Sequence, residues 1–167
     1  MALTREAGFG SRIAAFALLA LAAAASHAQG RFTISSDGHE VTDSTTGLIW
    51  RRCGEGTYWD GKTCNGKLVK LSYAGAKQAM EAAKATTGKS WRIPTREELV
   101  TLYDVKAKKK PKVDGTMFPK ATNGPFWATR AGTDDNLNAW LVNFGSGTVR
   151  GYTGQSKFPL RLVRAAS

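Results

Sequence analysis

The segment 91–99 is the part of this sequence that most constrains its fold, and it reads Trp-Arg-Ile-Pro-Thr-Arg-Glu-Glu-Leu. Thr95 and Glu98 stand at the spacing of a capping box, in which each side chain accepts a hydrogen bond from the other residue's backbone amide. The apolar positions that continue the helical period are Leu99, Leu102 and Tyr103. Because the cap, the proline and the apolar period agree, the segment predicts a short helix with a fixed start.

A longer helix is predicted immediately upstream, over residues 72–87. Ser72 can cap its start and Gly88 can end it. Small apolar residues recur along one helical stripe at Ala76, Ala79, Met80 and Ala83. The stripe predicts packing against the core and needs no functional explanation.

Short strand-like runs lie on both sides of the two helices. They cover residues 48–51, 126–129, 139–144, 148–150 and 160–163. Turn residues separate them, with Asp43 to Gly47 before the first run and Gly145-Ser146-Gly147 reading as a hairpin turn. Helices followed by several antiparallel strands predict a single α+β domain.

The N-terminus is predicted to be a cleavable secretory signal over residues 1–28. Arg5 and Arg12 precede an apolar stretch over 13–25, and small residues follow it at Ser26 and Ala28. The stretch is shorter than the roughly 20 residues that span a bilayer, so an uncleaved membrane anchor is the alternative that we disfavour. No cysteine follows it, which argues against a lipoprotein signal.

Signal cleavage would leave a flexible lead-in over residues 29–39 and a folded domain over 40–167. The two cysteines, Cys53 and Cys64, fall in this domain. In an exported protein, a pair at this separation predicts a disulfide closing a glycine-rich loop. We predict no metal site here, because two cysteines without neighbouring histidines do not fill the four positions around zinc.

The charge of the chain points to polyanions. The formal net charge is +11, and it falls only to +10 without residues 1–28, which hold two arginines and one glutamate. The densest cationic cluster comprises Lys106, Lys108, Lys109, Lys110 and Lys112, which Lys120 and Arg130 could extend. Lysine ammonium groups suit sulfate or phosphate groups on a flexible polymer. The alternative is a solvated lysine-rich loop that only keeps the protein soluble.

Aromatic residues offer a second kind of contact. Trp50, Trp91 and Trp127 lie inside strand-like or packed segments and are predicted to be core residues. Tyr58 and Trp59 lie within the loop between the cysteines, and we expect them at its tip, exposed for stacking on a sugar. Aromatic and basic residues together also bind single-stranded nucleic acid, but the predicted export argues against that partner.

Several motifs together resemble the Lcl C-terminal domain family, over nearly the whole chain after residue 40. They are Thr46-Gly47-Leu48-Ile49-Trp50 after Asp43, the block 91–99, Phe126-Trp127, and Leu160-Arg161-Leu162-Val163-Arg164. The block 91–99 is also similar to one in formylglycine-generating enzymes and other members of the C-type-lectin-like superfamily. The resemblance implies a C-type-lectin-like fold. It also implies sulfated glycosaminoglycans as a ligand class, because the bacterial collagen-like adhesin that names the family binds them.

The resemblance does not imply catalysis. The late pair of reactive cysteines in formylglycine-generating enzymes has no counterpart, since both cysteines here precede the first helix. His39 is the one histidine after residue 28, and no serine lies in a nucleophile elbow. An acid pair drawn from Glu97, Asp104 and Asp114 stays open as a hydrolytic alternative. The calcium motifs of true C-type lectins are absent, so the oxygen-rich run Asp134, Asp135, Asn136 and Asn138 is interpreted as a polar turn.

These observations predict a periplasmic or secreted domain that acts without a cofactor. Its expected role is non-catalytic binding of anionic glycans or cell-envelope polymers through the lysine-rich surface, with Tyr58 and Trp59 as accessory contacts. The alternative is a structural or inhibitory protein of the envelope that binds a protein partner.

Overall fold

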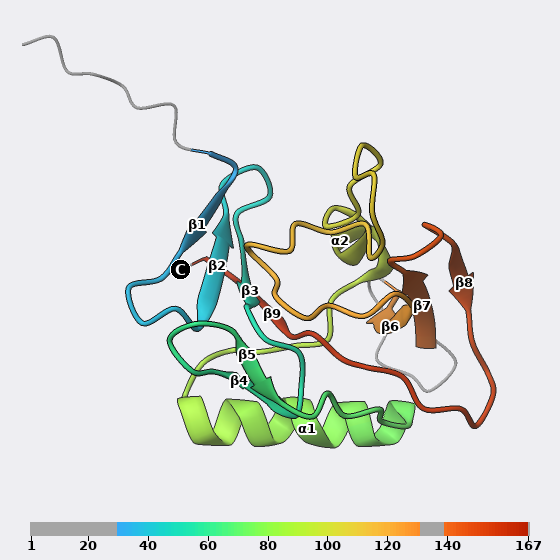
Figure 1. Cartoon of the computed structure of the whole chain (residues 1–167). Coiled ribbons are helices and arrows are strands. Elements are labelled where there is room, and N and C mark those ends of the chain that lie inside the picture. The colour runs from blue at the N-terminus through green and yellow to red at the C-terminus, as the bar shows by residue number, and fades with distance from the viewer. Residues whose placement is uncertain (1–29, 131–138, 167) are drawn as a thin grey trace, which may run out of the picture.

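The computed structural model describes residues 30–130 and 139–166 of the chain (Figure 1). Its two helices are α1 (Tyr73–Thr87) and α2 (Arg96–Val100). Its strands are β1 (Phe32–Ile34), β2 (Glu40–Asp43), β3 (Leu48–Arg51), β4 (Thr57–Trp59), β5 (Cys64–Gly66), β6 (Pro125–Thr129), β7 (Ala139–Asn143), β8 (Val149–Gly151) and β9 (Val163–Ala165). The predicted α+β class is confirmed.

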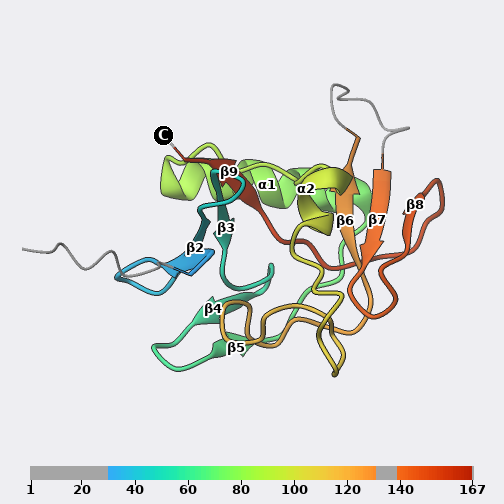
Figure 2. The ribbon, with the colours of Figure 1, turned by 90° about the horizontal axis from the view of Figure 1, so that it is seen from above.

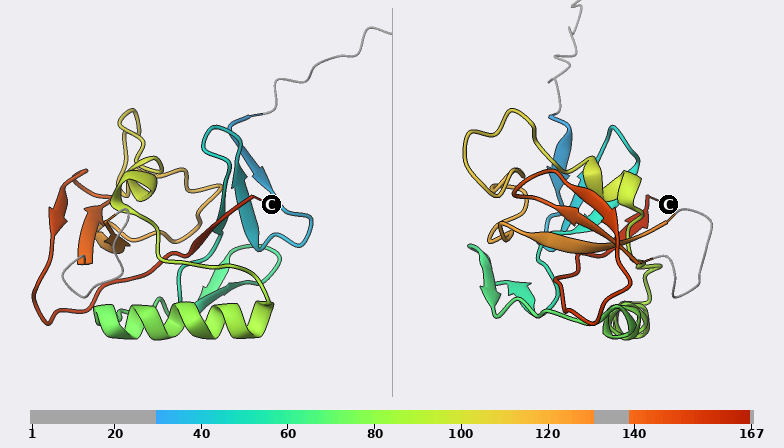
Figure 3. Two further views of the ribbon diagram at one scale, coloured as in Figure 1. Left: turned by 180° about the vertical axis from the view of Figure 1, so that it is seen from behind. Right: turned by 90° about the vertical axis from the view of Figure 1, so that its right-hand side faces the viewer.

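The strands form three antiparallel sheets, ordered β1-β2-β3-β9, β4-β5 and β6-β7-β8. The first and last strands share the four-stranded sheet, because β9 pairs with β3 from Leu48↔Ala165 to Trp50↔Val163. Helix α1 runs beneath both larger sheets, which stand over its opposite ends (Figures 1 and 3). Viewed from above, the β4-β5 hairpin lies on the side of the molecule away from α1 (Figure 2).

Both helices begin where the sequence predicts, and α1 also ends where predicted, whereas α2 ends at Val100, before Leu102 and Tyr103, which were expected to continue its period. Ser72 Oγ accepts a hydrogen bond from the Gly75 amide at 3.1 Å, and Gly88 ends α1 in the left-handed conformation at φ 65°. At α2 the Thr95 amide donates to Glu98 Oε2 at 2.9 Å, and the Glu98 amide donates to Thr95 Oγ1 at 3.2 Å. The predicted capping box is therefore present on both sides.

The core has two clusters, one for each helix. Leu99 of α2 packs with Trp50, Phe126 and Phe144, whereas Ala76 and Ala83 of α1 pack with Trp91, Trp127 and Leu141. The three tryptophans predicted to be core residues are each at most 2% exposed. Removing such side chains from water supplies most of the stability of a domain this size.

The structure corrects three expectations about local structure. Residues Phe32–Ile34, expected within a flexible lead-in, form β1 and pair with β2 from Phe32↔Asp43 to Ile34↔Val41. Their sequence is too short to show a period, but Arg31 fixes the strand by donating to both carboxylate oxygens of the buried Asp43.

The second correction concerns the predicted strand over 160–163. Leu160 and Leu162 are fully buried, but their carbonyls accept single bonds from the amides of Glu55 and Arg51, each at 3.0 Å, and the β9 ladder begins only at Val163. The apolar residues of the segment 160–163 therefore indicate burial in the core, and they do not indicate pairing in a sheet.

The third correction concerns the loop between the cysteines, which contains the β4-β5 hairpin. Tyr58 and Trp59 lie in β4, and the tip of the loop is the turn Asp60 to Thr63.

Candidate functional site

The lysine-rich segment forms an anchored loop, here called the lysine loop (residues 104–114). The Asp104 amide donates to the Lys112 carbonyl at 2.9 Å, and the Lys112 amide donates to the Phe144 carbonyl at 2.7 Å, just after β7. Val113 is buried beneath the loop. These contacts fix the backbone, while four lysine side chains remain exposed, namely Lys106, Lys108, Lys109 and Lys110.

Four of the predicted cations converge on one hollow. Lys108, Lys109, Lys110 and Lys120 line a space of about 610 Å³, here called the lysine hollow, together with Pro111, Val113 and Phe118. Among the described residues, no acidic side chain lines it. Like charges brought together repel one another, so a bound polyanion would lower the electrostatic energy of this surface.

The predicted role of Lys120 as an extension of the cluster agrees with this placement. Lys120 adopts φ 55°, a left-handed conformation that a residue with a side chain rarely takes. Its charge also acts on Asp60 at the tip of the β4-β5 hairpin. The pKa of Asp60 is lowered first by hydrogen bonds from the amides of Thr63 and Lys62, and further by Lys120.

Lys62, at the tip of the hairpin, is a further exposed cation that the sequence patterns did not single out. Its amide donates to Asp60 Oδ1 at 2.9 Å, and its side chain is exposed. The Asp-Gly-Lys-Thr turn at 60–63 was the available signal, because it predicts a tight hairpin tip. Nothing in the sequence says that Asp60 in this tip comes within electrostatic reach of Lys120.

The other predicted cations lie elsewhere. Lys106 lines a separate hollow with Asp104 and Asp114, and Lys112 Nζ lies 5.8 Å from the centre of the Tyr103 ring. Arg130 lines a third hollow along α1, together with Lys77, Lys84 and Arg92. The structure therefore divides the predicted cluster, with four lysines in one place and three cations outside it.

Arg52 ties the disulfide hairpin to the segment that follows the lysine loop. Its guanidinium donates to the carbonyls of Thr116 at 3.0 Å and Met117 at 3.3 Å, and to Gly38 at 3.4 Å. It also lies 3.6 Å from the centre of the Trp59 ring. Burial lowers the pKa of Arg52, and its side chain has little exposed surface for a ligand.

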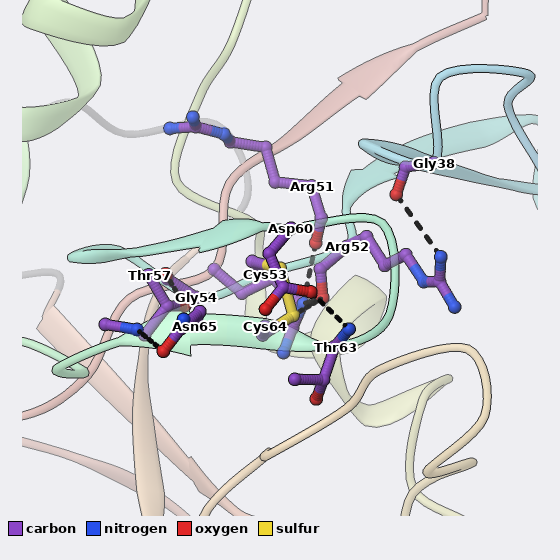
Figure 4. Close-up of a disulfide and its surroundings, with 12 residues drawn as sticks. Gly38, Arg51, Arg52, Cys53, Gly54, Thr57, Asp60, Thr63, Cys64 and Asn65 are labelled. Carbon is purple, nitrogen blue, oxygen red and sulfur yellow. Dashed lines mark hydrogen bonds between the residues drawn. A yellow bond between two sulfur atoms is a disulfide. The ribbon is translucent and has the colours of Figure 1, made fainter.

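The predicted disulfide is present and joins Cys53, directly after Arg52, to Cys64 at the turn end of the β4-β5 hairpin (Figure 4). Cys64 pairs with Trp59 across the hairpin. The cross-link thus ties β5, next to the turn, to the residue that follows Arg52.

The two aromatic residues predicted to stack on sugars differ in exposure. Tyr58 is 59% exposed. Trp59 is half-buried, since one face covers Arg52 and its edge approaches Gly38, where an added Cβ would lie 2.3 Å from Trp59 Nε1. Tyr58 is therefore the accessible ring of the pair.

A family model described as the Lcl C-terminal domain matches residues 39–164. The chain belongs to this family. No curated protein and no solved structure matches the chain. The resemblance inferred from the sequence motifs is thus confirmed at the level of the family.

The matched part of this Lcl C-terminal domain runs from His39, just before β2, into β9. It contains the lysine hollow, the disulfide and both helices, but it leaves out β1. The acid run Asp134, Asp135, Asn136 and Asn138 and the predicted signal over 1–28 lie outside the described residues.

Two further observations concern the described part of the Lcl C-terminal domain alone. Over residues 30–130 and 139–166, no three His, Cys, Asp or Glu side chains gather where a metal ion could be held. Over the same residues, neither helix has both the length and the apolar character that a membrane span requires.

Proposed function

We propose that this Lcl C-terminal domain is an exported, non-catalytic module that binds anionic glycans or cell-envelope polymers through the lysine hollow. The observation that carries the proposal is the convergence of Lys108, Lys109, Lys110 and Lys120 on a hollow that no described acidic side chain lines. Export is supported by the sequence of residues 1–28 and by the disulfide between Cys53 and Cys64, which persists in oxidising compartments.

Geometry distinguishes this surface from ordinary solvated lysines. A lysine paired with a carboxylate, such as Lys84 with Glu81 at 2.9 Å, has its charge largely compensated. The lysines of the hollow come instead from two separate segments, and their backbones are held by the contacts of Lys112 and by the left-handed Lys120. A polymer with repeated sulfate, phosphate or carboxylate groups can therefore meet several cations without ordering the loop first.

Immobilised heparin and lipopolysaccharide are the probes for this function. Wild-type protein should bind at low salt and elute as salt rises, because screening weakens such contacts. The test variant replaces Lys108, Lys109, Lys110 and Lys120 with alanine. The matched control removes the same charge from exposed cations elsewhere, at Lys67, Lys70, Arg150 and Lys157. Binding should be lost in the test variant alone, and wild-type protein that ignores both probes at low salt would refute the function.

The fold that we propose for the domain is C-type-lectin-like, related to the formylglycine-generating enzymes in the block 91–99. Supporting this are the two helices, the antiparallel sheets and the placing of the first and last strands in one sheet. A crystal structure superposed on members of that superfamily tests it.

A protein partner is the second candidate, and the hollow along α1 favours it. That hollow combines apolar side chains with paired charges, among them Met80, Ile93 and the Arg92–Glu98 ion pair. A partner of this kind would stay bound in a pull-down at high salt, where the lysine contacts are screened.

A further inference from the structure

A second hollow has Tyr58 in its lining, and its chemistry differs from that of the lysine hollow. It has a volume of about 290 Å³ and is here called the Tyr58 hollow. Its lining includes Asp37, His39, Glu40, Tyr58, Lys89 and Trp91. Its size is near the lower end of ligand pockets, which hold roughly 300–1,000 Å³.

The charges in the Tyr58 hollow compensate one another. Glu40 forms ion pairs with Lys89 and, at 2.7 Å, with Arg164. Arg51 in the same wall pairs with Glu55 at 2.7 Å. A polyanion would gain little here, because each basic side chain already faces a carboxylate.

The same groups suit a ligand rich in hydroxyls. Carboxylates accept hydrogen bonds, ammonium groups donate them, and a sugar hydroxyl can do both. Trp91 is 2% exposed and its indole Nε1 has no acceptor among the described residues. Because this nitrogen is itself buried, Trp91 forms part of the wall of the hollow, and its indole N–H serves as a spectroscopic probe of the hollow and not as a ligand contact.

Tyr58 supplies the apolar side of such a site. Its ring is 59% exposed at the rim, where the C–H face of a sugar can pack against it. Tyr58 and Asp60 are two residues apart at the end of β4, which corresponds to about 7 Å of extended chain. Asp60 follows Trp59, which lines the Tyr58 hollow, and lies within the electrostatic reach of Lys120, which lines the lysine hollow.

We propose that the Tyr58 hollow binds one uncharged sugar ring of the same polysaccharide whose anionic groups contact the lysine hollow. The inference rests on the proposed function, since it makes the ligand a chain in which anionic groups and uncharged hydroxyl-rich rings alternate. Tyr58 stacks on the ring, and the Glu40–Lys89 pair provides the polar contacts.

The experiment uses NMR titration of the ¹⁵N-labelled protein with a neutral probe, the disaccharide of N-acetylglucosamine, and separately with a heparin tetrasaccharide. The neutral probe should shift the indole N–H signals of Trp91 and Trp59. Tyr58→Ala should weaken the affinity for the neutral disaccharide about tenfold, as expected for the loss of an aromatic contact. Val149→Ala, an exposed apolar change on β8, should leave both titrations unchanged.

The four-lysine variant separates this inference from the proposed function. This variant should no longer bind the heparin tetrasaccharide but should still bind the neutral disaccharide. If heparin binds but the neutral probe leaves the Trp91 signal unmoved, the subsite is wrong and the proposed function stands. If the neutral probe binds but heparin does not, the shared polysaccharide is refuted. If Tyr58→Ala leaves the neutral titration unchanged, the stacking contact is refuted.

Discussion

The exposed lysines and the buried arginines of this domain contribute to the same net charge, but their surroundings differ. Lys108, Lys109 and Lys110 lie on an exposed loop around a hollow without described acids. Arg161 is 1% exposed and donates to the carbonyls of Arg51 and Arg52, with its guanidinium 4.8 Å from the centre of the Phe118 ring. Burial lowers the pKa of Arg161 to about 9, although the charge of Glu55 partly opposes this.

The difference shows that net charge alone does not count the cations available to a ligand. Arg52 and Arg161 use their donors on backbone carbonyls and hold the disulfide hairpin and the segment after the lysine loop in place. The exposed lysines make few contacts within the fold, so their charge remains available to a ligand. Buried cations should therefore matter for stability, and exposed ones for binding.

The largest effect on stability should follow Arg161→Met. The variant leaves the carbonyls of Arg51 and Arg52 without their donor, and each buried unsatisfied group costs about 1–3 kcal/mol, for a total near 3 kcal/mol. Urea unfolding followed by tryptophan fluorescence measures it. Lys109→Met, the exposed counterpart, should leave the midpoint nearly unchanged. Equal losses in the two variants would contradict the distinction between buried and exposed cations.

The next largest effect should follow replacement of both Cys53 and Cys64 by alanine. Loss of the cross-link should destabilise the fold by about 2–3 kcal/mol, because the unfolded chain regains the freedom of the closed loop. The midpoint of thermal unfolding reports the loss. Heparin affinity measured at low temperature, where the variant stays folded, should be largely retained because Lys112 still anchors the lysine loop. An unchanged midpoint would mean that the hairpin is held by Arg52 and Trp59 alone.

A smaller loss of stability should accompany acidification. Burial alone would raise the pKa of Glu40, Asp43 and Glu98, but hydrogen bonds from basic partners outweigh it and hold each pKa below its ordinary value. A lowered folded-state pKa gives stability that is present above the unfolded value, near 4 for these carboxyls, and lost as pH falls through the folded value.

Urea midpoints between pH 6 and pH 2 should therefore fall mainly below about pH 4. Glu98→Gln removes the charge on one of these carboxylates and should flatten that fall. A midpoint that rises on acidification would show that burial of carboxyls such as Glu55, whose pKa burial raises, outweighs the ion pairs.

Lys120→Gly should give the smallest effect on stability and the opposite sign. Glycine relieves the left-handed backbone of Lys120 but is more flexible when unfolded, so the net gain is about 0.5 kcal/mol. Heparin binding should weaken at the same time, because one cation of the hollow is lost. Lys120→Asn, which also tolerates this conformation, is the matched control for the backbone. If Lys120→Gly is more stable than the wild type and binds heparin with the same affinity, Lys120 lies outside the binding site.

The two helices and the disulfide could be predicted from the sequence, because the residues that determine each of them lie close together in the chain. The Thr95–Glu98 cap and the Ser72 and Gly88 ends of α1 are of this kind. Strand β1 and the offset of β9 depend on distant pairing, and Leu160 and Leu162 are buried without joining a ladder.

The candidate site was predictable in composition but not in arrangement. The run over 106–112 marks the lysines, whereas the joining of Lys120 to the lysine hollow and the separate placing of Arg130 depend on the tertiary fold. Tyr58 and Trp59 are neighbours in the sequence, yet Arg52 covers only Trp59. Such differences follow from contacts between segments that sequence spacing does not record.

The salt dependence of heparin affinity tests the central claim most directly. Dissociation constants for wild type, for the variant lacking Lys108, Lys109, Lys110 and Lys120, and for the charge-matched control would be measured over a range of salt concentrations. The account predicts a slope of log affinity against log salt that is shallower in the four-lysine variant by roughly one unit per contacting lysine, and unchanged in the control. Equal slopes and equal losses of affinity in the two variants would show that net charge alone attracts heparin, and would contradict a binding site at the lysine hollow.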